Sequence, residues 1–238
     1  MQLINDDCFN VLGEMTDGSV DLIVTDPPYG MDYDPDSRTG KGRFGKIIGD
    51  KNLAWLDDFV DEAFRVLKPD SAMFIFCSWH KVDIFKQSLE RKFKVKNMLV
   101  WVKNVHGLGD LKGSFSPKHE LCFYVQKGRV LNRGKRIPDV LNFAKIPSKE
   151  LKHPAEKPVA MLDLMIRNSS DEGDLVLDPF MGSGTTGLAC IKGGGVDLWV
   201  LNSIKAILIL QWKGCRMEAV SCATKEDAEK SIIENERD

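Results

Sequence analysis

Two short apolar runs that each end in an aspartate and a proline constrain the fold of this chain most strongly. Residues 20–25 lead into Asp26-Pro27-Pro28-Tyr29, and residues 175–177 lead into Asp178-Pro179-Phe180. Runs this apolar, without polar alternation, are typical of strands that helices cover on both faces of a sheet. Ligands of open α/β sheets bind at the carboxyl ends of the strands, so both aspartates are predicted to lie at a binding edge.

The segments between these runs alternate between helical and strand patterns. No helical pattern separates the apolar segments 98–102 and 121–125, which favours an antiparallel hairpin at one edge of the sheet. Pro69 is expected to end the helix before it. The predicted helices cover residues 56–67, 82–91 and 161–166, and the predicted strands cover residues 20–25, 72–77, 98–102, 121–125 and 174–178.

The first motif places a carboxylate, a proline-fixed carbonyl and an aromatic ring at one strand end. Prolines fix φ and lack an N–H, so the turn is rigid and its carbonyl groups can accept hydrogen bonds. Asp26 and the Pro27 carbonyl could both accept from the exocyclic amino group of a flipped-out adenine, while Tyr29 stacks on the base. An ordinary strand-ending turn uses the same residue types and is the alternative interpretation.

The second motif continues from Asp178 through Phe180-Met181-Gly182-Ser183-Gly184 and indicates a strand, a glycine turn and a helix start. The glycines let the backbone approach a ligand closely, and the helix start offers unpaired N–H groups. No Gly-Lys-Ser/Thr follows, so this is not a Walker phosphate loop. The spacing of Gly182, Gly184 and Gly187 fits a dinucleotide fingerprint, but the preceding Asp-Pro-Phe distinguishes it.

The two motifs in this order resemble those of the β-class DNA amino-methyltransferases that use S-adenosylmethionine, the adenine-N6 and cytosine-N4 family. The resemblance covers about residues 1–192. Asn5-Asp6-Asp7-Cys8 resembles the family's Gly-Asp-Cys turn, whose acid contacts the cofactor's adenine, and residues 153–158 resemble its His-Pro-x-x-Lys-Pro segment. The resemblance implies a Rossmann-like methyltransferase fold of the α/β class, with a mixed, mostly parallel sheet, an antiparallel edge hairpin and helices on both faces.

The resemblance also implies the residues of the site. A direct displacement of the methyl group needs no covalent intermediate, so no catalytic cysteine is expected. His119 and Glu120 also match a family segment, but we interpret them as a structural turn pair. The catalytic residues that the family implies are Asp26, Pro27, Pro28 and Tyr29. Those that it implies for S-adenosylmethionine are Asp7, Cys8, Lys157, Asp178, Phe180, Gly182, Ser183, Gly184, Thr185, Thr186 and, where a glutamate is usual, Asn202.

The charge pattern suits double-stranded DNA as the partner, although the net charge is −2. Residues 101–152 carry eleven Lys/Arg against four Asp/Glu. A basic face of this kind attracts a polyanion; solvated basic loops are the alternative interpretation. A second basic cluster follows Tyr29 and consists of Arg38, Lys41, Arg43 and Lys46.

A chain of 238 residues suits one domain. The six cysteines form no Cys-x-x-Cys pair, so neither a zinc site nor a disulfide framework is indicated. The absence of a signal peptide and of a long apolar run predicts a cytoplasmic protein without a membrane partner. The resemblance adds a cognate restriction endonuclease as a candidate partner. We expect a single domain over 1–238, with cofactor and catalytic motifs in 1–30 and 153–192 and DNA-recognition loops in 31–52 and 104–150.

The chain departs from the family after Lys192, where a strand with a glutamate for the cofactor's ribose should follow. Leu201-Asn202 stands at that position instead. If each codon is read one base earlier, Trp199-Val200 must give Gly and Trp212-Lys213 must give Glu. The other positions permit Arg-Arg-Phe-Met-Gly-Ile-Glu-Leu-Asp-Lys-Ser-Tyr, which resembles the missing segment of the family. Our hypothesis is that residues 194–220 are translated out of frame; lineage-specific drift is the alternative.

Three functions follow from these observations. The predicted one is site-specific methylation of adenine N6 in DNA. Cytosine-N4 methylation is the second, although Ser in the place of Asp26 is its commoner sign. The third is a catalytically impaired relative that retains at most DNA binding, because the acid for the ribose is missing.

Overall fold

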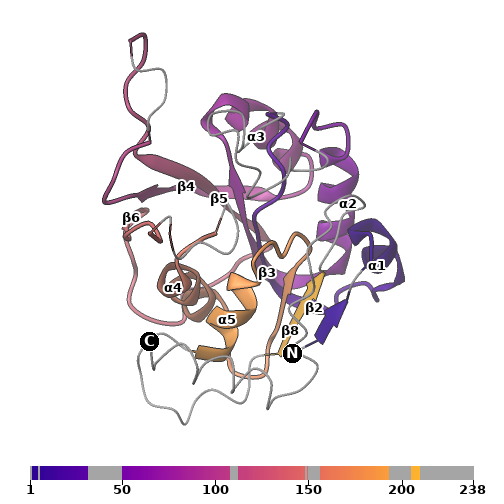
Figure 1. Ribbon diagram of the computed structural model, residues 1–238. Helices are drawn as coiled ribbons and strands as arrows, with labels where there is room; N and C mark the ends of the chain where they lie inside the picture. The colour runs from indigo at the N-terminus through magenta and orange to yellow at the C-terminus, as the bar shows by residue number, and fades with distance from the viewer. Residues whose placement is uncertain are drawn as a thin grey trace.

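The computed structural model of the protein describes residues 2–4, 6–31, 50–107, 112–147, 149, 156–192 and 205–209. Its centre is an eight-stranded sheet with the order β1-β8-β7-β2-β3-β5-β4-β6 (Figure 1). Among these strands, β5 pairs antiparallel with both of its neighbours, and every other pairing is parallel. The strands are β1 (Gln2–Ile4), β2 (Val20–Thr25), β3 (Leu67–Cys77), β4 (Lys94–Val102), β5 (His119–Lys127), β6 (Val140–Asn142), β7 (Leu175–Asp178) and β8 (Lys205–Ile209).

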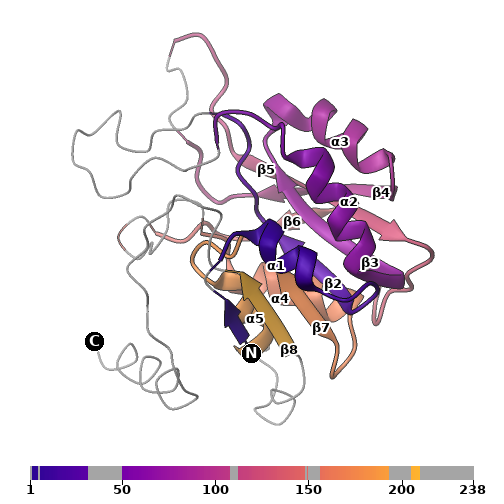
Figure 2. The ribbon, with the colours of Figure 1, turned by 90° about the vertical axis from the view of Figure 1, so that its right-hand side faces the viewer.

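Helices cover both faces of the sheet (Figures 1 and 2). Ile23 of β2 belongs to the apolar core under α1, α2 and α3, whereas its neighbours Leu22 and Val24 belong to the core under α4 and α5. This double coverage is why the strand is apolar at successive positions. The helices are α1 (Cys8–Glu14), α2 (Leu56–Val66), α3 (Val82–Glu90), α4 (Val159–Ser169) and α5 (Thr185–Lys192), with a 3-10 turn η1 (Trp79–Lys81).

The predicted mixed α/β sheet and its antiparallel hairpin are confirmed, and the hairpin is formed by β4 and β5. The edge strand itself is β6, which we did not predict and which pairs parallel with β4. Each predicted helix and strand between residues 20 and 178 lies within or close to an observed one. We also did not predict β1 or α1, because both are short and follow each other without an apolar period.

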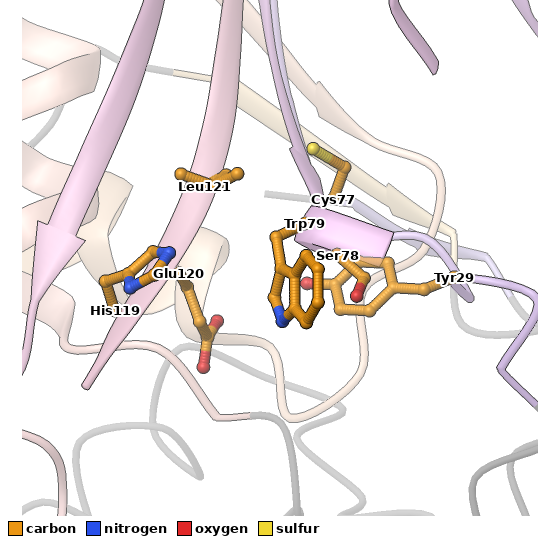
Figure 3. Close-up of a pocket in the computed structure, with 7 residues that line it drawn as sticks. All are labelled: Tyr29, Cys77, Ser78, Trp79, His119, Glu120 and Leu121. Carbon is orange, nitrogen blue, oxygen red and sulfur yellow. The ribbon is translucent and has the colours of Figure 1, made fainter. Parts of the chain in front are cut away.

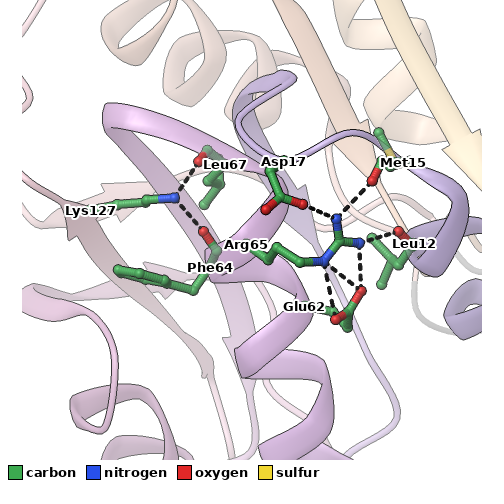
Figure 4. Close-up of polar contacts among 8 residues, drawn as sticks. All are labelled: Leu12, Met15, Asp17, Glu62, Phe64, Arg65, Leu67 and Lys127. Atoms are coloured by element: carbon green, nitrogen blue, oxygen red, sulfur yellow. Dashed lines mark hydrogen bonds and ion pairs between the residues drawn. The ribbon is translucent and has the colours of Figure 1, made fainter.

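Two basic side chains tie α2 to its neighbours at the amino ends of β2 and β3 (Figure 4). Arg65 donates to the carbonyl oxygens of Leu12 and Met15 at 2.5 and 2.7 Å. Lys127 of β5 donates to the carbonyl oxygens of Phe64 and Leu67, at 2.6 Å each. Cations are favourable at a helix carboxyl end, where carbonyl groups lack intrahelical partners. These bonds stabilise the amino ends of β2 and β3, and Asp26 lies at the opposite, carboxyl end of β2.

No helix among the described residues is long and apolar enough to cross a membrane. Residues 32–49, residues 151–155 and most of the segment 194–220 lie outside the described residues. The predictions made for these parts of the chain therefore stay predictions.

Candidate active site

Asp26 follows the last residue of β2 and has a donor on each carboxylate oxygen. The Tyr29 hydroxyl donates to Oδ1. The Lys157 ammonium donates to Oδ2 at 2.5 Å. The motif thus folds back on itself. The Tyr29 hydroxyl occupies Asp26 Oδ1, the carboxylate oxygen that Lys157 leaves open.

Lys157 comes from the segment that leads into α4, and its side chain is only 5 % exposed. Its Nζ lies 3.2 Å from Glu120 Oε2 and 4.8 Å from the centre of the Phe76 ring. Burial lowers the pKa of Lys157, but the charges of Asp26 and Glu120 together raise it above its ordinary value. The side chain therefore remains an ammonium ion, as a buried base between two carboxylates should.

Glu120 connects this lysine to the β4–β5 hairpin. Lys103 Nζ lies 2.5 Å from Glu120 Oε1. Burial raises the pKa of Glu120, but the charges of Lys157 and Lys103 lower it by more. The pKa of Glu120 therefore lies below its ordinary value. The prediction that His119 and Glu120 form a turn pair is wrong, because both residues lie in β5. The contacts with Lys103 and Lys157 show the role of Glu120, and the match of its segment to the family was a usable sequence signal.

A pocket of about 140 Å³ opens beside this charged group (Figure 3). Tyr29 and Trp79 line it from the ends of β2 and β3, and His119 and Glu120 line it from the start of β5. Trp79 is 59 % exposed, so an aromatic side chain at the pocket is accessible to a ligand. Sequence reasoning did not identify Trp79, although its place directly after the strand 72–77, beside the Asp26 strand, was a usable signal. The remaining lining residues are Cys77, Ser78 and Leu121.

Asp178 connects three elements at the end of β7. Its Oδ1 accepts from the Thr25 hydroxyl at 3.0 Å and from the Phe180 N–H at 3.1 Å, and its Oδ2 accepts from the Thr186 hydroxyl at 2.6 Å. Burial raises the pKa of Asp178 to about 6, although these three hydrogen bonds oppose the rise. Because Thr25 ends β2 and Thr186 lies in α5, this carboxyl group fixes the glycine turn relative to the Asp26 strand.

The glycine turn itself has the backbone that its sequence predicts. Gly182 and Gly184 have φ values of 54° and 78°, in the left-handed region that favours glycine. The Ser183 and Thr185 hydroxyls lie 2.7 Å apart. Phe180 packs against Trp55 and Phe59, with both ring centroids at 5.3 Å. The packing of Phe180 on these two aromatic side chains therefore stabilises the start of the turn.

Three residues predicted for the cofactor lie away from the glycine turn in sequence: Asp7, Cys8 and Asn202. Asp7 caps α1 by accepting from the Phe9 N–H at 2.9 Å, after β1 and at the same sheet edge as Asp178. Cys8 is fully buried in the core, so its thiol cannot reach a ligand. Asn202 lies outside the described residues, and the sheet position between β1 and β7 is filled by β8, which begins at Lys205.

Comparisons with known proteins agree with this geometry. The N6_N4_Mtase family model, described as DNA methylase, matches residues 20–198. The protein YubD of Escherichia coli (strain K12) is 35 % identical over 202 residues, which cover 83 % of this chain and 84 % of that one. The DNA adenine methyltransferase YhdJ of the same organism is 28 % identical over 228 residues, with 81 % and 75 % covered.

A solved structure shares the fold. The crystal structure of the M1.HpyAVI-SAM complex superposes with a TM-score of 0.64 at 25 % sequence identity, covering 88 % of this chain and 94 % of that one. The predicted Rossmann-like methyltransferase fold is thereby confirmed.

Proposed function

Because the chain belongs to the N6_N4_Mtase family of DNA methylases, we propose that it transfers a methyl group from S-adenosylmethionine to N6 of an adenine in DNA. The observation that carries the proposal is the Asp26 carboxylate at the end of β2, held by Lys157 and Tyr29 beside an open pocket. An aspartate at this position favours adenine over cytosine, and the relative YhdJ is a DNA adenine methyltransferase by name.

The residues around the glycine turn fit S-adenosylmethionine. The left-handed Gly182 and Gly184 bring backbone N–H groups to the start of α5, and Asp7 places a carboxylate at the same sheet edge. We assign contact with the cofactor to Asp7, Phe180 and the turn 182–184, as well as to Asn202. Asp178 and Thr186 shape the turn through their hydrogen bond, and Thr185 shapes it through its contact with Ser183. Cys8 packs in the same core as Phe180. The bound cofactor supplies an electrophilic methyl group on its sulfonium.

Asp26 and Tyr29 exchange partners when the target base enters. The amino group replaces the Tyr29 hydroxyl on Asp26 Oδ1, which releases the ring to stack on the base. The Pro27 carbonyl, in the rigid Pro27-Pro28 turn, is the second acceptor. Two acceptors draw the nitrogen lone pair out of conjugation and align it with the methyl group. After transfer the nitrogen loses one proton, for which Asp26 is the nearest carboxylate.

Double-stranded DNA is the proposed substrate, and the whole chain acts as one methyltransferase domain. Residues 31–52 and 104–150 are the proposed recognition elements, because they carry the basic clusters of the sequence. The second range is not one loop, since it contains β5 and β6, and His119, Glu120 and Leu121 of β5 line the pocket. A restriction endonuclease that cleaves the same site is a proposed companion of the enzyme.

The test is methyl transfer from labelled S-adenosylmethionine to unmethylated DNA, followed by nucleoside analysis. We expect label in N6-methyladenine, and a loss of at least about 100-fold in kcat for Asp26→Asn, because one electrostatic acceptor at a reacting group is worth this much. Glu90→Gln, on the surface of α3, is the control. Label in N4-methylcytosine would contradict adenine as the substrate and support the cytosine-N4 alternative. No label at all would contradict methyl transfer to DNA.

A further inference from the structure

Four charged side chains from separate parts of the chain form a row that ends at Asp26. Lys103 pairs with Glu120 at 2.5 Å, Glu120 with Lys157 at 3.2 Å, and Lys157 with Asp26 at 2.5 Å. The signs alternate and the four charges sum to zero. Lys103 and Glu120 belong to the β4–β5 hairpin, and Lys157 connects them to Asp26.

Lys157 faces two carboxylates from different elements. Asp26 approaches it from the end of β2 and Glu120 from β5. The Phe76 ring of β3 lies beneath it, and the Cys122 thiol of β5 lies close enough to sense its charge. Burial raises the pKa of the Cys122 and Cys77 thiols well above neutrality, so both stay uncharged. Among the described residues, Asp26 and Glu120 are the two carboxylates that form ion pairs with this ammonium.

We propose that Glu120 is a positioning residue for methyl transfer. Anchored by Lys103, it holds the Lys157 ammonium on Oδ2 of Asp26 and so reserves Oδ1 for the target amino group. This inference rests on the proposed function, because it assigns to Glu120 the orientation of the carboxylate that receives the amino group.

The physical reason is competition for one carboxylate. With Glu120 present, Lys157 donates a hydrogen bond to Asp26 and forms an ion pair with Glu120. Without that charge, Asp26 is the one carboxylate left beside a buried ammonium among the described residues, and the ammonium can shift across both of its oxygens. It then competes with the weakly basic amino group, which cannot displace a charge-assisted hydrogen bond.

The first test is the kinetics of Glu120→Gln, which keeps the shape of the side chain and removes its charge. We expect kcat to fall by about 10- to 100-fold, as a small misplacement of a reacting group does, while KM for DNA and for S-adenosylmethionine changes by less than about 3-fold. Glu120→Asp, which keeps the charge, should recover part of kcat. Glu90→Gln removes a carboxylate from the exposed Lys86–Glu90 pair and should leave kcat unchanged.

The second test does not depend on activity. In NMR spectra of protein with labelled lysine side chains, the Lys157 Nζ resonance should move in Glu120→Gln, because the ammonium loses one of its two carboxylate partners. Glu90→Gln should leave this resonance in place. If Glu120→Gln does not fold, Lys103→Gln applies the same test, with an expected loss of about 3- to 10-fold in kcat.

The outcomes separate the two proposals. An active wild type with unchanged kcat in Glu120→Gln overturns the positioning role and leaves the proposed function standing. A wild type that transfers no methyl group to DNA overturns the proposed function. In that case the Lys157 resonance still decides whether Glu120 fixes Lys157, and an unmoved resonance in Glu120→Gln overturns the inference.

Discussion

Tyr29 illustrates how one residue can serve two states of a site. Its hydroxyl donates to Asp26, and its pKa is raised well above the ordinary value by burial and by the charges of Asp26 and Glu120. The hydroxyl therefore stays protonated and remains a donor at any physiological pH. In the proposed reaction only the ring is needed, since the hydroxyl must leave Asp26 before the base can bind.

Two substitutions of Tyr29 separate these roles. Tyr29→Phe keeps the ring and removes the competing donor, so we expect kcat within about 3-fold of the wild type. Tyr29→Ala removes the stacking surface, which is worth about 1–3 kcal/mol per base, so KM for DNA should rise by about 10- to 100-fold. Steady-state kinetics of both variants on the same duplex measure this. Equal defects in the two variants would show that the hydroxyl, not the ring, is what the reaction uses.

The sequence identified the residues that stand in contiguous motifs but not their remote partners. Asp26 and Tyr29 are three residues apart in one rigid turn, so their proximity follows from local geometry. Lys157 is 131 residues from Asp26, and it was assigned to the cofactor, whereas the structure places its ammonium on the Asp26 carboxylate. Glu120 was interpreted as a turn residue for the same reason. Pairing across a sheet decides such contacts, and a single sequence does not encode it locally.

At the scale of elements, Asp178 connects β7, β2 and α5 through a carboxyl group that is 3 % exposed. Its pKa is about 6 in the folded protein and about 3.8 ordinarily. A raised carboxyl pKa means that the folded state retains its proton longer than the unfolded state. Stability should therefore fall as pH rises from about 4 to about 6, and by linkage this amounts to about 3 kcal/mol.

Asp178→Asn tests this connection. The amide oxygen can accept from Phe180 and Thr25, and the NH₂ group can donate to the Thr186 hydroxyl, so the fold should tolerate it. Urea unfolding from pH 4 to pH 7 should show the wild type losing about 3 kcal/mol relative to the variant. The exposed Asp58→Asn is the control and should run parallel to the wild type. Parallel curves for Asp178→Asn would mean that Asp178 is not the source of the pH dependence.

Long elements with a clear apolar period were predictable, and short or edge elements were not. α2 and α3 each bury one apolar face, and β2 is apolar at the successive positions 22–24 because helices cover both of its faces. β1 and β6 have three residues each, too few for any period. Their place in the sheet follows from neighbouring strands, which is tertiary information.

At the scale of the whole molecule, the unusual region is the one after α5. The family match ends at residue 198, close to where the sequence departs from the family pattern. The sheet nevertheless has a strand between β1 and β7, namely β8, whose register pairs Leu208 with Asp178 and with Leu3. Lys205-Ala-Ile-Leu-Ile209 is apolar enough to fill this position, but it carries no acid for a ribose. A sheet position can thus be occupied without the chemistry that the family places there.

The out-of-frame hypothesis can be tested by nucleotide sequencing, and it predicts where the missing glutamate would stand. Nucleotide sequence across residues 193–221 must permit Asp-Lys-Ser-Tyr in the shifted frame after the glutamate, and a sequence that does not permit it excludes the hypothesis. If it is permitted, the frame-restored chain carries a glutamate at the junction of Leu201 and Asn202.

Restoring that glutamate should strengthen S-adenosylmethionine binding by about 1.5–3 kcal/mol, or roughly 10- to 100-fold in Kd, because a charge-assisted hydrogen bond replaces an amide contact. Calorimetric titration of both chains measures the change. Changing the restored glutamate to Gln should remove most of the gain, which separates the carboxylate from the repair of the strand. Equal affinity in the two chains would show that β8 and its neighbours already supply what the cofactor needs, and the chain as it stands would then be the functional form.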